Sequence, residues 1–173
     1  MDQNPVAHSQ LIRRILFCTD FSPNADFAFD YAIAATIAHP GSTLFLLHVI
    51  PEPEAQFWKT YVYEIEDVDA KAKQAIDERV AAYRARLPAG IGFQPEYRVG
   101  KDWQEILKFA DGQRIDLIVM GRHGRSGLEK VFFGNVTERV ARRAPCPVLI
   151  VPWSFRRVVG DLGEAAAPPP AQA

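Results

Sequence analysis

Residues 15–23 have the sequence ILFCTDFSP, in which an apolar run leads directly into the start of a helix. Residues 15–18 predict a buried strand, and Ser22 followed by Pro23 is typical of a helix N-cap and first turn. We expect this helix to continue until His39-Pro40-Gly41 ends it. A strand joined directly to a helix is the unit from which α/β folds are built.

The same alternation of strands and helices continues along the chain. After the helix over residues 23–38, further strands are expected over residues 43–50, 91–99, 116–120 and 147–151, and further helices over residues 65–87, 102–112 and 136–143. Pro95 has no amide hydrogen to donate, so the strand that contains it is expected at an edge of the sheet. The pattern favours a five-stranded, parallel, Rossmann-like sheet in the strand order 3-2-1-4-5, with helices on both faces.

The length of 173 residues favours one domain, and the 48% hydrophobic and 24% charged residues are typical of soluble globular proteins. We expect a flexible N-terminus over residues 1–12, a domain over residues 13–157 and a disordered tail over residues 158–173. The formal net charge of −1 argues against nucleic acid and anionic membranes as partners.

The expected cellular location is the cytoplasm. The sequence contains no signal-peptide core and no run of about 18 apolar residues, so neither export nor a membrane span is expected. Cys18 and Cys146 lie in apolar stretches and are expected to be buried, reduced thiols.

A ligand site is expected where the winding direction of the sheet reverses, beyond the carboxyl ends of the first and fourth strands. Asp20 follows the first of these strands, and the glycine turn Gly121-Arg122-His123-Gly124 follows the other. Glycines let the backbone approach a phosphate, and Gly134-Asn135 begins a helix whose N–H groups attract anions. Residues 121–157 carry eight basic and two acidic residues, a net charge of +6. These residues alone leave open whether the glycines bind phosphate or only form tight turns.

The glycines belong to a longer pattern, Gly121-x2-Gly124-x9-Gly134-Asn135. Together with Thr19-Asp20-Phe21-Ser22 and Pro145-Cys146-Pro147-Val148, this pattern resembles the universal stress protein family from about Arg13 to Pro152. The resemblance implies an adenine-nucleotide-hydrolase-like fold and a role in stress-response signalling or regulation. It also implies binding of ATP, or of the related nucleotides AMP or ADP, with Mg²⁺ accompanying the nucleotide. A homodimer is implied as well.

The resemblance also implies a set of contact residues. Those expected to contact adenosine or line the base pocket are Cys18, Asp20, Val49 and Met120. Those expected to hold the phosphates are Gly121, His123, Gly124, Gly134, Asn135 and Val136. Asn135 stands where the family pattern has Ser or Thr, so a hydroxyl contact to phosphate is absent.

Several of these residues have a purely structural alternative. Asp20 could only hydrogen-bond its loop or cap the first helix, and Asn135 with Glu138 has the spacing of a capping box. Basic residues beside the glycines could steer phosphates or simply be exposed, namely Arg122, Arg125 and Lys130. No metal site is expected, because the spacing of His8, His39 and His48 is not typical of metal ligands.

Three functions are compatible with the sequence. The first is a universal stress protein that binds ATP as a signal, and the second is a family member that binds no nucleotide and acts as a dimeric interaction module. The third is a slow ATP hydrolase, disfavoured because no catalytic residue and no Gly-x4-Gly-Lys-Ser/Thr motif stands beside the glycines. The dimer is expected through the apolar strand at residues 148–151, bounded by Pro147 and Pro152.

Overall fold

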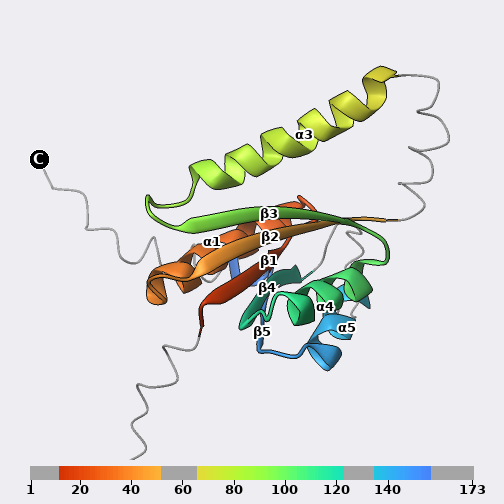
Figure 1. Cartoon of the computed structure of the whole chain (residues 1–173). Helices are drawn as coiled ribbons and strands as arrows, with labels where there is room; N and C mark the ends of the chain where they lie inside the picture. The colour runs from red at the N-terminus through yellow and green to blue at the C-terminus, as the bar shows by residue number, and fades with distance from the viewer. Residues whose placement is uncertain (1–11, 52–65, 123–134, 157–173) are drawn as a thin grey trace, which may run out of the picture.

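The computed structural model describes residues 12–51, 66–122 and 135–156 (Figure 1). The elements in chain order are β1 (Arg14–Cys18), α1 (Pro23–Ala38), β2 (Thr43–Ile50), α3 (Glu66–Ala85), β3 (Gly92–Val99), α4 (Asp102–Gly112), β4 (Leu117–Arg122), α5 (Asn135–Arg143) and β5 (Val148–Pro152). One expected boundary was wrong: Gly121 and Arg122, predicted to begin a loop, continue β4 because they pair with Val151 and Pro152 of β5. The predictions for the N-terminus, the glycine loop beyond Arg122 and the tail fall outside the described residues.

The five strands form one parallel sheet in the order β3-β2-β1-β4-β5, which confirms the predicted fold class and strand order. The winding direction reverses between β1 and β4, where Cys18 is the register partner of Met120. β3, which contains Pro95, lies at one edge as expected, and β5 lies at the other.

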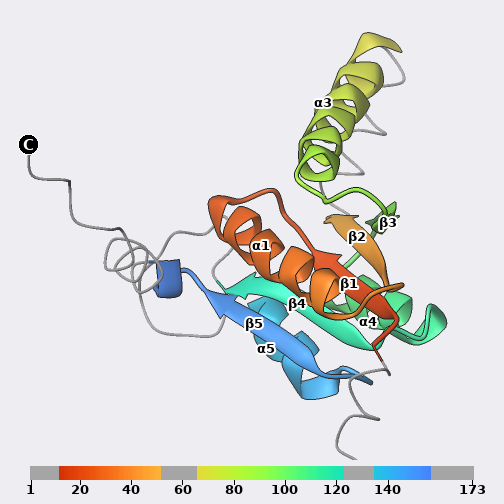
Figure 2. The same ribbon diagram turned by 90° about the vertical axis from the view of Figure 1, so that its left-hand side faces the viewer.

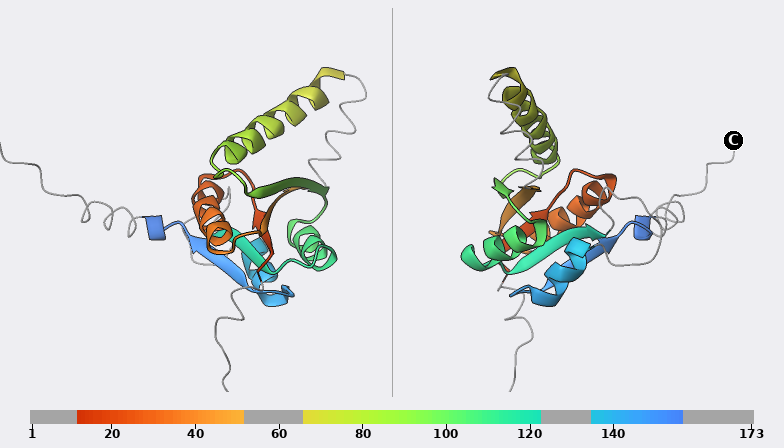
Figure 3. Two further views of the ribbon diagram at one scale, coloured as in Figure 1. Left: turned by 60° about the vertical axis from the view of Figure 1, so that its left-hand side comes forward. Right: turned by 90° about the vertical axis from the view of Figure 1, so that its right-hand side faces the viewer.

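Helices cover both faces of the sheet. Figures 2 and 3 show α1 on one side, with α4 and α5 on the other. Because successive strand residues point to opposite faces, Ile15 and Phe17 pack toward α1 while Leu16 and Cys18 pack toward α4 and α5. We call the buried side chains on the α1 side of the sheet the α1 core, and those on the side of α4 and α5 the α4–α5 core.

α1 begins and ends where its local sequence predicts. The Ser22 hydroxyl oxygen accepts a hydrogen bond from the Ala25 amide at 3.3 Å, and Pro23 occupies the first turn. At the other end the amide of His39 donates to the carbonyl oxygens of Ala35 and Thr36. Gly41 follows with a φ of +83°, a conformation that glycine adopts without a steric penalty.

α3 packs on the α1 side through one end of its apolar stripe. Val80 and Tyr83 are buried in the α1 core, and Ile76 and Leu87 pack against its margin. Figure 1 shows the helix rising away from the sheet toward its Glu66 end. Within the described part of the chain, no helix is long and apolar enough to cross a membrane.

Candidate functional site

The carboxyl ends of β1, β2 and β4 bring three residues predicted to line the base pocket to one face of the sheet. Cys18 is the register partner of both Leu47 and Met120, and Val49 lies two residues beyond Leu47 on the same side of β2. Val136, in the first turn of α5, packs against the same α4–α5 core. Cys18, Val49, Met120 and Val136 therefore share one apolar surface at this edge.

The two thiols form no disulfide, and both have a raised pKa. Cys18 is 8% exposed, and its burial raises the pKa of the thiol above the ordinary value. Cys146 is half-buried, and its pKa is raised mainly by burial and then by the charge of Asp116. At neutral pH both thiols are protonated, so Cys18 offers a neutral, apolar surface to its neighbours.

Asp20 lies in the loop between β1 and α1, beside this apolar surface. One carboxylate oxygen, Oδ1, accepts a hydrogen bond from the Ser22 amide at 3.0 Å, so the loop contact that we considered as an alternative role is present. The preceding residue ties the loop to the sheet, because the Thr19 amide donates to the Leu47 carbonyl oxygen at 3.0 Å. Asp20 is thus half-buried at the carboxyl end of β1, where the winding direction of the sheet reverses between β1 and β4.

Phe21 adopts a left-handed backbone conformation with a φ of +59°. For a bulky residue this conformation costs about 1–2 kcal/mol, so neighbouring contacts must hold it. The Phe21 amide donates to the Thr19 hydroxyl oxygen at 2.9 Å, and its ring lies 4.5 Å from the His48 ring, between centroids. His48 Nδ1 also lies 2.9 Å from the Thr19 carbonyl oxygen.

Two residues of α3 contact the same loop. The Tyr83 hydroxyl donates to Asp26 in the first turn of α1 and lies 3.2 Å from the Thr19 hydroxyl oxygen. Burial, together with the hydrogen bond to Asp26, raises the pKa of Tyr83 well above its ordinary value, so the hydroxyl stays protonated at neutral pH. Arg79 Nη1 donates to the Phe21 carbonyl oxygen at 3.4 Å.

Sequence reasoning missed Phe21, His48, Arg79 and Tyr83 as neighbours of Asp20. Tyr83 was covered only by the helix predicted over residues 65–87, and His48 was considered only as a histidine without metal-like spacing. Thr19 and Tyr83 are 64 residues apart, so no local pattern predicts their contact.

Gly121 has a packing role that the sequence did not indicate. A Cβ atom added to Gly121 would lie 2.6 Å from the Asn24 carbonyl oxygen, closer than real Cβ atoms come to backbone. The glycine therefore allows the first turn of α1 to pack against β4. This is a different reason from the ligand approach that we expected at this position.

The other predicted phosphate contacts lie largely beyond what the structure describes. His123, Gly124, Gly134, Arg125 and Lys130 fall outside the described residues. Asn135 is the first residue of α5, and its side chain is not among those described. Glu138, its predicted capping-box partner, has its Oε1 atom 3.1 Å from Arg142 Nη2 in an ion pair along the helix.

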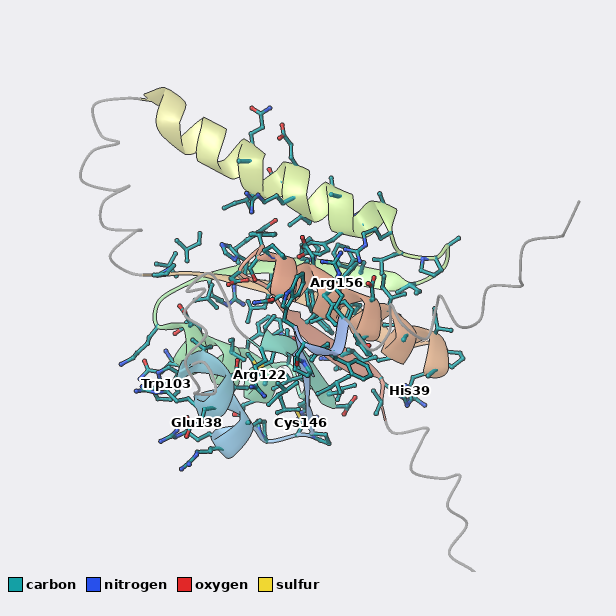
Figure 4. The ribbon with its side chains drawn as sticks, turned by 180° about the vertical axis from the view of Figure 1, so that it is seen from behind. His39, Trp103, Arg122, Glu138, Cys146 and Arg156 are labelled. Carbon is teal, nitrogen blue, oxygen red and sulfur yellow. The ribbon has the colours of Figure 1, made fainter. Side chains whose placement is uncertain are left out.

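Positive charge gathers on α4 and α5 around Trp103. The guanidinium carbons of Arg139 and Arg143 lie 5.4 and 5.3 Å from the Trp103 ring centroid, and Lys101 Nζ lies at 5.8 Å. Figure 4 shows Arg122 on the same half of the molecule as Trp103 and Glu138, whereas His39 lies at the opposite end of the sheet. Of the basic residues predicted to carry the local positive charge of residues 121–157, Arg122 lies at the end of β4, and Arg139, Arg142 and Arg143 lie on α5.

The described residues present no group of three His, Cys, Asp or Glu placed to hold a metal ion. His39 caps the end of α1, with Nδ1 2.8 Å from the Ala35 carbonyl oxygen, and His48 contacts the loop after β1. His8 lies outside the described residues.

A five-stranded parallel sheet with this strand order and helices on both faces defines a doubly wound, Rossmann-like α/β protein. The model of the universal stress protein family matches residues 11–152, and the chain belongs to that family.

Relatives agree with this assignment over most of the chain. A universal stress protein of Thermus aquaticus is 32% identical, with 82% of this chain and 99% of the relative covered. The universal stress protein MJ0577 of Methanocaldococcus jannaschii is 28% identical, with 83% of this chain and 96% of the relative covered. The solved structure of MJ0577 superposes with a TM-score of 0.67 at 29% identity, covering 82% of this chain and 96% of that one.

A further universal stress protein has been solved in complex with cAMP. Its TM-score with this chain is 0.52 at 24% identity, with 80% of this chain and 95% of the other covered. At this identity the likeness is one of fold.

Proposed function

We propose that this chain binds ATP, or the related nucleotides ADP or AMP, beyond the carboxyl ends of β1 and β4, and that the bound state serves as a stress-response signal. The observation that carries the proposal is the strand register, which brings Cys18, Met120 and Val49 to one face beside Asp20. The chain's membership of the universal stress protein family supports the same ligand class. A protein of this fold has been solved with cAMP, which makes adenine nucleotides the first ligands to test.

Each residue has a role that its chemistry suits. The apolar surface of Cys18, Val49 and Met120 covers the adenine ring, which buries well against uncharged side chains. The Asp20 carboxylate accepts hydrogen bonds from ribose hydroxyls, as acidic residues do in other doubly wound folds.

The phosphates take the positive end of the site. We expect the backbone N–H groups of Asn135 and Val136, at the start of α5, to face an anion. Those of Gly121 at the end of β4, and of His123, Gly124 and Gly134, are proposed to complete the phosphate site. Mg²⁺ that arrives with the nucleotide is held mainly by phosphate oxygens and water rather than by a cage of protein carboxylates.

We expect no fast chemistry at this site. The sequence has no Gly-x4-Gly-Lys-Ser/Thr motif to align phosphates and Mg²⁺ for efficient hydrolysis, so ATP turnover should be slow. The protein is proposed to act in the cytoplasm as a homodimer paired through β5.

The direct test is to release and identify any nucleotide that copurifies with the protein. Heat extraction followed by chromatography should yield ATP. ADP or AMP would favour the slow hydrolase, and an empty extract together with no ATP binding in calorimetry would favour the interaction module.

A point substitution then tests the location of the site. Gly124→Val should abolish ATP binding in calorimetry with the fold retained, because a branched side chain blocks backbone approach to the phosphates. Gly112→Val is the matched control, since a Cβ atom added at the end of α4 meets no atom within 4 Å among the described residues. Unchanged ATP affinity in a folded Gly124→Val protein would show that the phosphates do not bind at this loop.

A further inference from the structure

The loop that carries Asp20 is held by side chains from α3, a helix that supplies none of the proposed nucleotide contacts. Thr19 and Phe21, on either side of Asp20, are both contacted by α3: Thr19 by Tyr83, and Phe21 by Arg79 and Tyr83. The conformation of the backbone around the carboxylate therefore depends on where α3 lies.

A directed chain of hydrogen bonds joins the loop to α1 through Tyr83. The Tyr83 hydroxyl has one proton, which it donates to Asp26, so at Thr19 it acts as the acceptor. The Thr19 hydroxyl then donates to Tyr83 and uses its oxygen to accept the Phe21 amide at 2.9 Å. All three hydrogen bonds point the same way, from the Phe21 amide through the hydroxyls of Thr19 and Tyr83 to the Asp26 carboxylate. In such a series each hydrogen bond strengthens the next.

Arg79 holds the same turn from the outside. Its Nη1 atom donates to the Phe21 carbonyl oxygen at 3.4 Å, and its guanidinium carbon lies 5.5 Å from the centroid of the Phe21 ring. Phe21 has a φ of +59°, which a bulky residue keeps only when its surroundings require it. The Tyr83 hydroxyl and the Arg79 guanidinium are the contacts from α3 that impose this conformation.

We infer that Tyr83 and Arg79 are positioning residues for nucleotide binding, through which the placement of α3 sets the loop conformation in which Asp20 meets the nucleotide. This inference rests on the proposed function. It makes α3 the regulatory element of the site: displacing α3 weakens nucleotide binding, and a bound nucleotide in turn stabilises the docked position of α3, because coupling between two sites is reciprocal.

Tyr83→Phe is the principal test because it removes the hydroxyl and keeps the ring that packs against Phe29, with centroids 4.5 Å apart. We expect ATP affinity in calorimetry to fall by about three- to tenfold, the equivalent of one intramolecular hydrogen bond. The Phe21 amide should also exchange its hydrogen faster in the nucleotide-free protein. Tyr31→Phe is the matched control, since the Tyr31 ring packs with Phe27 and Phe155 and not with the Asp20 loop, and neither readout should change.

Arg79→Gln provides a second test that leaves the core untouched, because Arg79 is exposed. It should weaken ATP binding less than Tyr83→Phe does. Arg84→Gln makes the same charge change on the same helix, but Arg84 lies over Phe93 of β3, and it should bind ATP as the unmodified protein does.

The outcomes separate this inference from the proposed function. A lower melting temperature in Tyr83→Phe with unchanged ATP affinity and unchanged Phe21 exchange would show a merely structural role and overturn the inference. An unmodified protein that binds no adenine nucleotide would overturn the proposed function, and with it the role of the two residues in binding. In that case faster Phe21 exchange in Tyr83→Phe would still establish that α3 holds the loop.

Discussion

Gly121 shows how a single missing Cβ atom allows two elements to meet. A Cβ atom there would lie 2.6 Å from the oxygen and 2.9 Å from the carbon of the Asn24 carbonyl group, both backbone atoms that cannot rotate away. Gly121→Ala should therefore push the start of α1 away from β4, and should lower the free energy of unfolding by about 1–3 kcal/mol. Urea denaturation followed by circular dichroism measures this change.

Gly112→Ala is the control for this substitution, because the added methyl group meets open space at the end of α4. Alanine is the better helix former, so the control should be as stable as the unmodified protein or slightly more stable. Equal unfolding free energies for Gly121→Ala and the unmodified protein would mean that α1 adjusts without cost and that the glycine is retained for another reason.

At the scale of elements, the start of α5 carries Asn135, for which the family resemblance implies Ser or Thr. Asn suits a helix start about as well as Ser does, so we expect Asn135 to leave the backbone N–H groups of α5 available to a phosphate. The substitution Asn135→Ser restores the hydroxyl of the family pattern. It should tighten ATP binding by about tenfold or less, because a hydrogen bond to a charged group contributes about 1.5–3 kcal/mol and the Asn amide already supplies part of it.

Calorimetry and a thermal melt of both proteins in one buffer test this prediction, with the melting temperature expected to be nearly unchanged. Weaker ATP binding by Asn135→Ser would show that the Asn side chain is itself the adapted phosphate contact.

For the whole molecule, the exposed edge of the sheet predicts a homodimer. Within the described part of the chain β5 pairs with β4 on one side only, and Leu149 of β5 is 38% exposed. An apolar strand at an uncovered edge favours pairing with a second copy, between Pro147 and Pro152, which cannot donate a ladder hydrogen bond. Light scattering at micromolar concentration should give the mass of a dimer.

The substitution Leu149→Lys should shift this mass toward that of the monomer, since a buried lysine would stand unpaired in the interface. Ile37→Lys, at a residue of α1 that is 58% exposed and does not belong to the edge strand, should leave the dimer intact. A monomeric unmodified protein would contradict the predicted assembly.

The sequence by itself determined those features whose physical cause is local. The apolar runs at residues 15–18 and 44–47 form buried strands. Ser22 with Pro23 begins α1 through atoms within a few residues. Pro95 carries no amide hydrogen, so its strand belongs at an edge whatever surrounds it. The strand order followed because helices joining parallel strands allow few topologies, and Cys18, Val49 and Met120 of the candidate site then came together through the strand register.

Only the tertiary structure decided which distant side chains hold the site. The need for glycine at position 121 comes from the Asn24 carbonyl of another element, nearly a hundred residues earlier. The left-handed backbone of Phe21 is imposed by His48 and by the α3 residues Arg79 and Tyr83, none of which is its neighbour in sequence. These contacts depend on how a helix and a strand dock on the sheet, and docking is settled by the packing of the whole core rather than by local patterns.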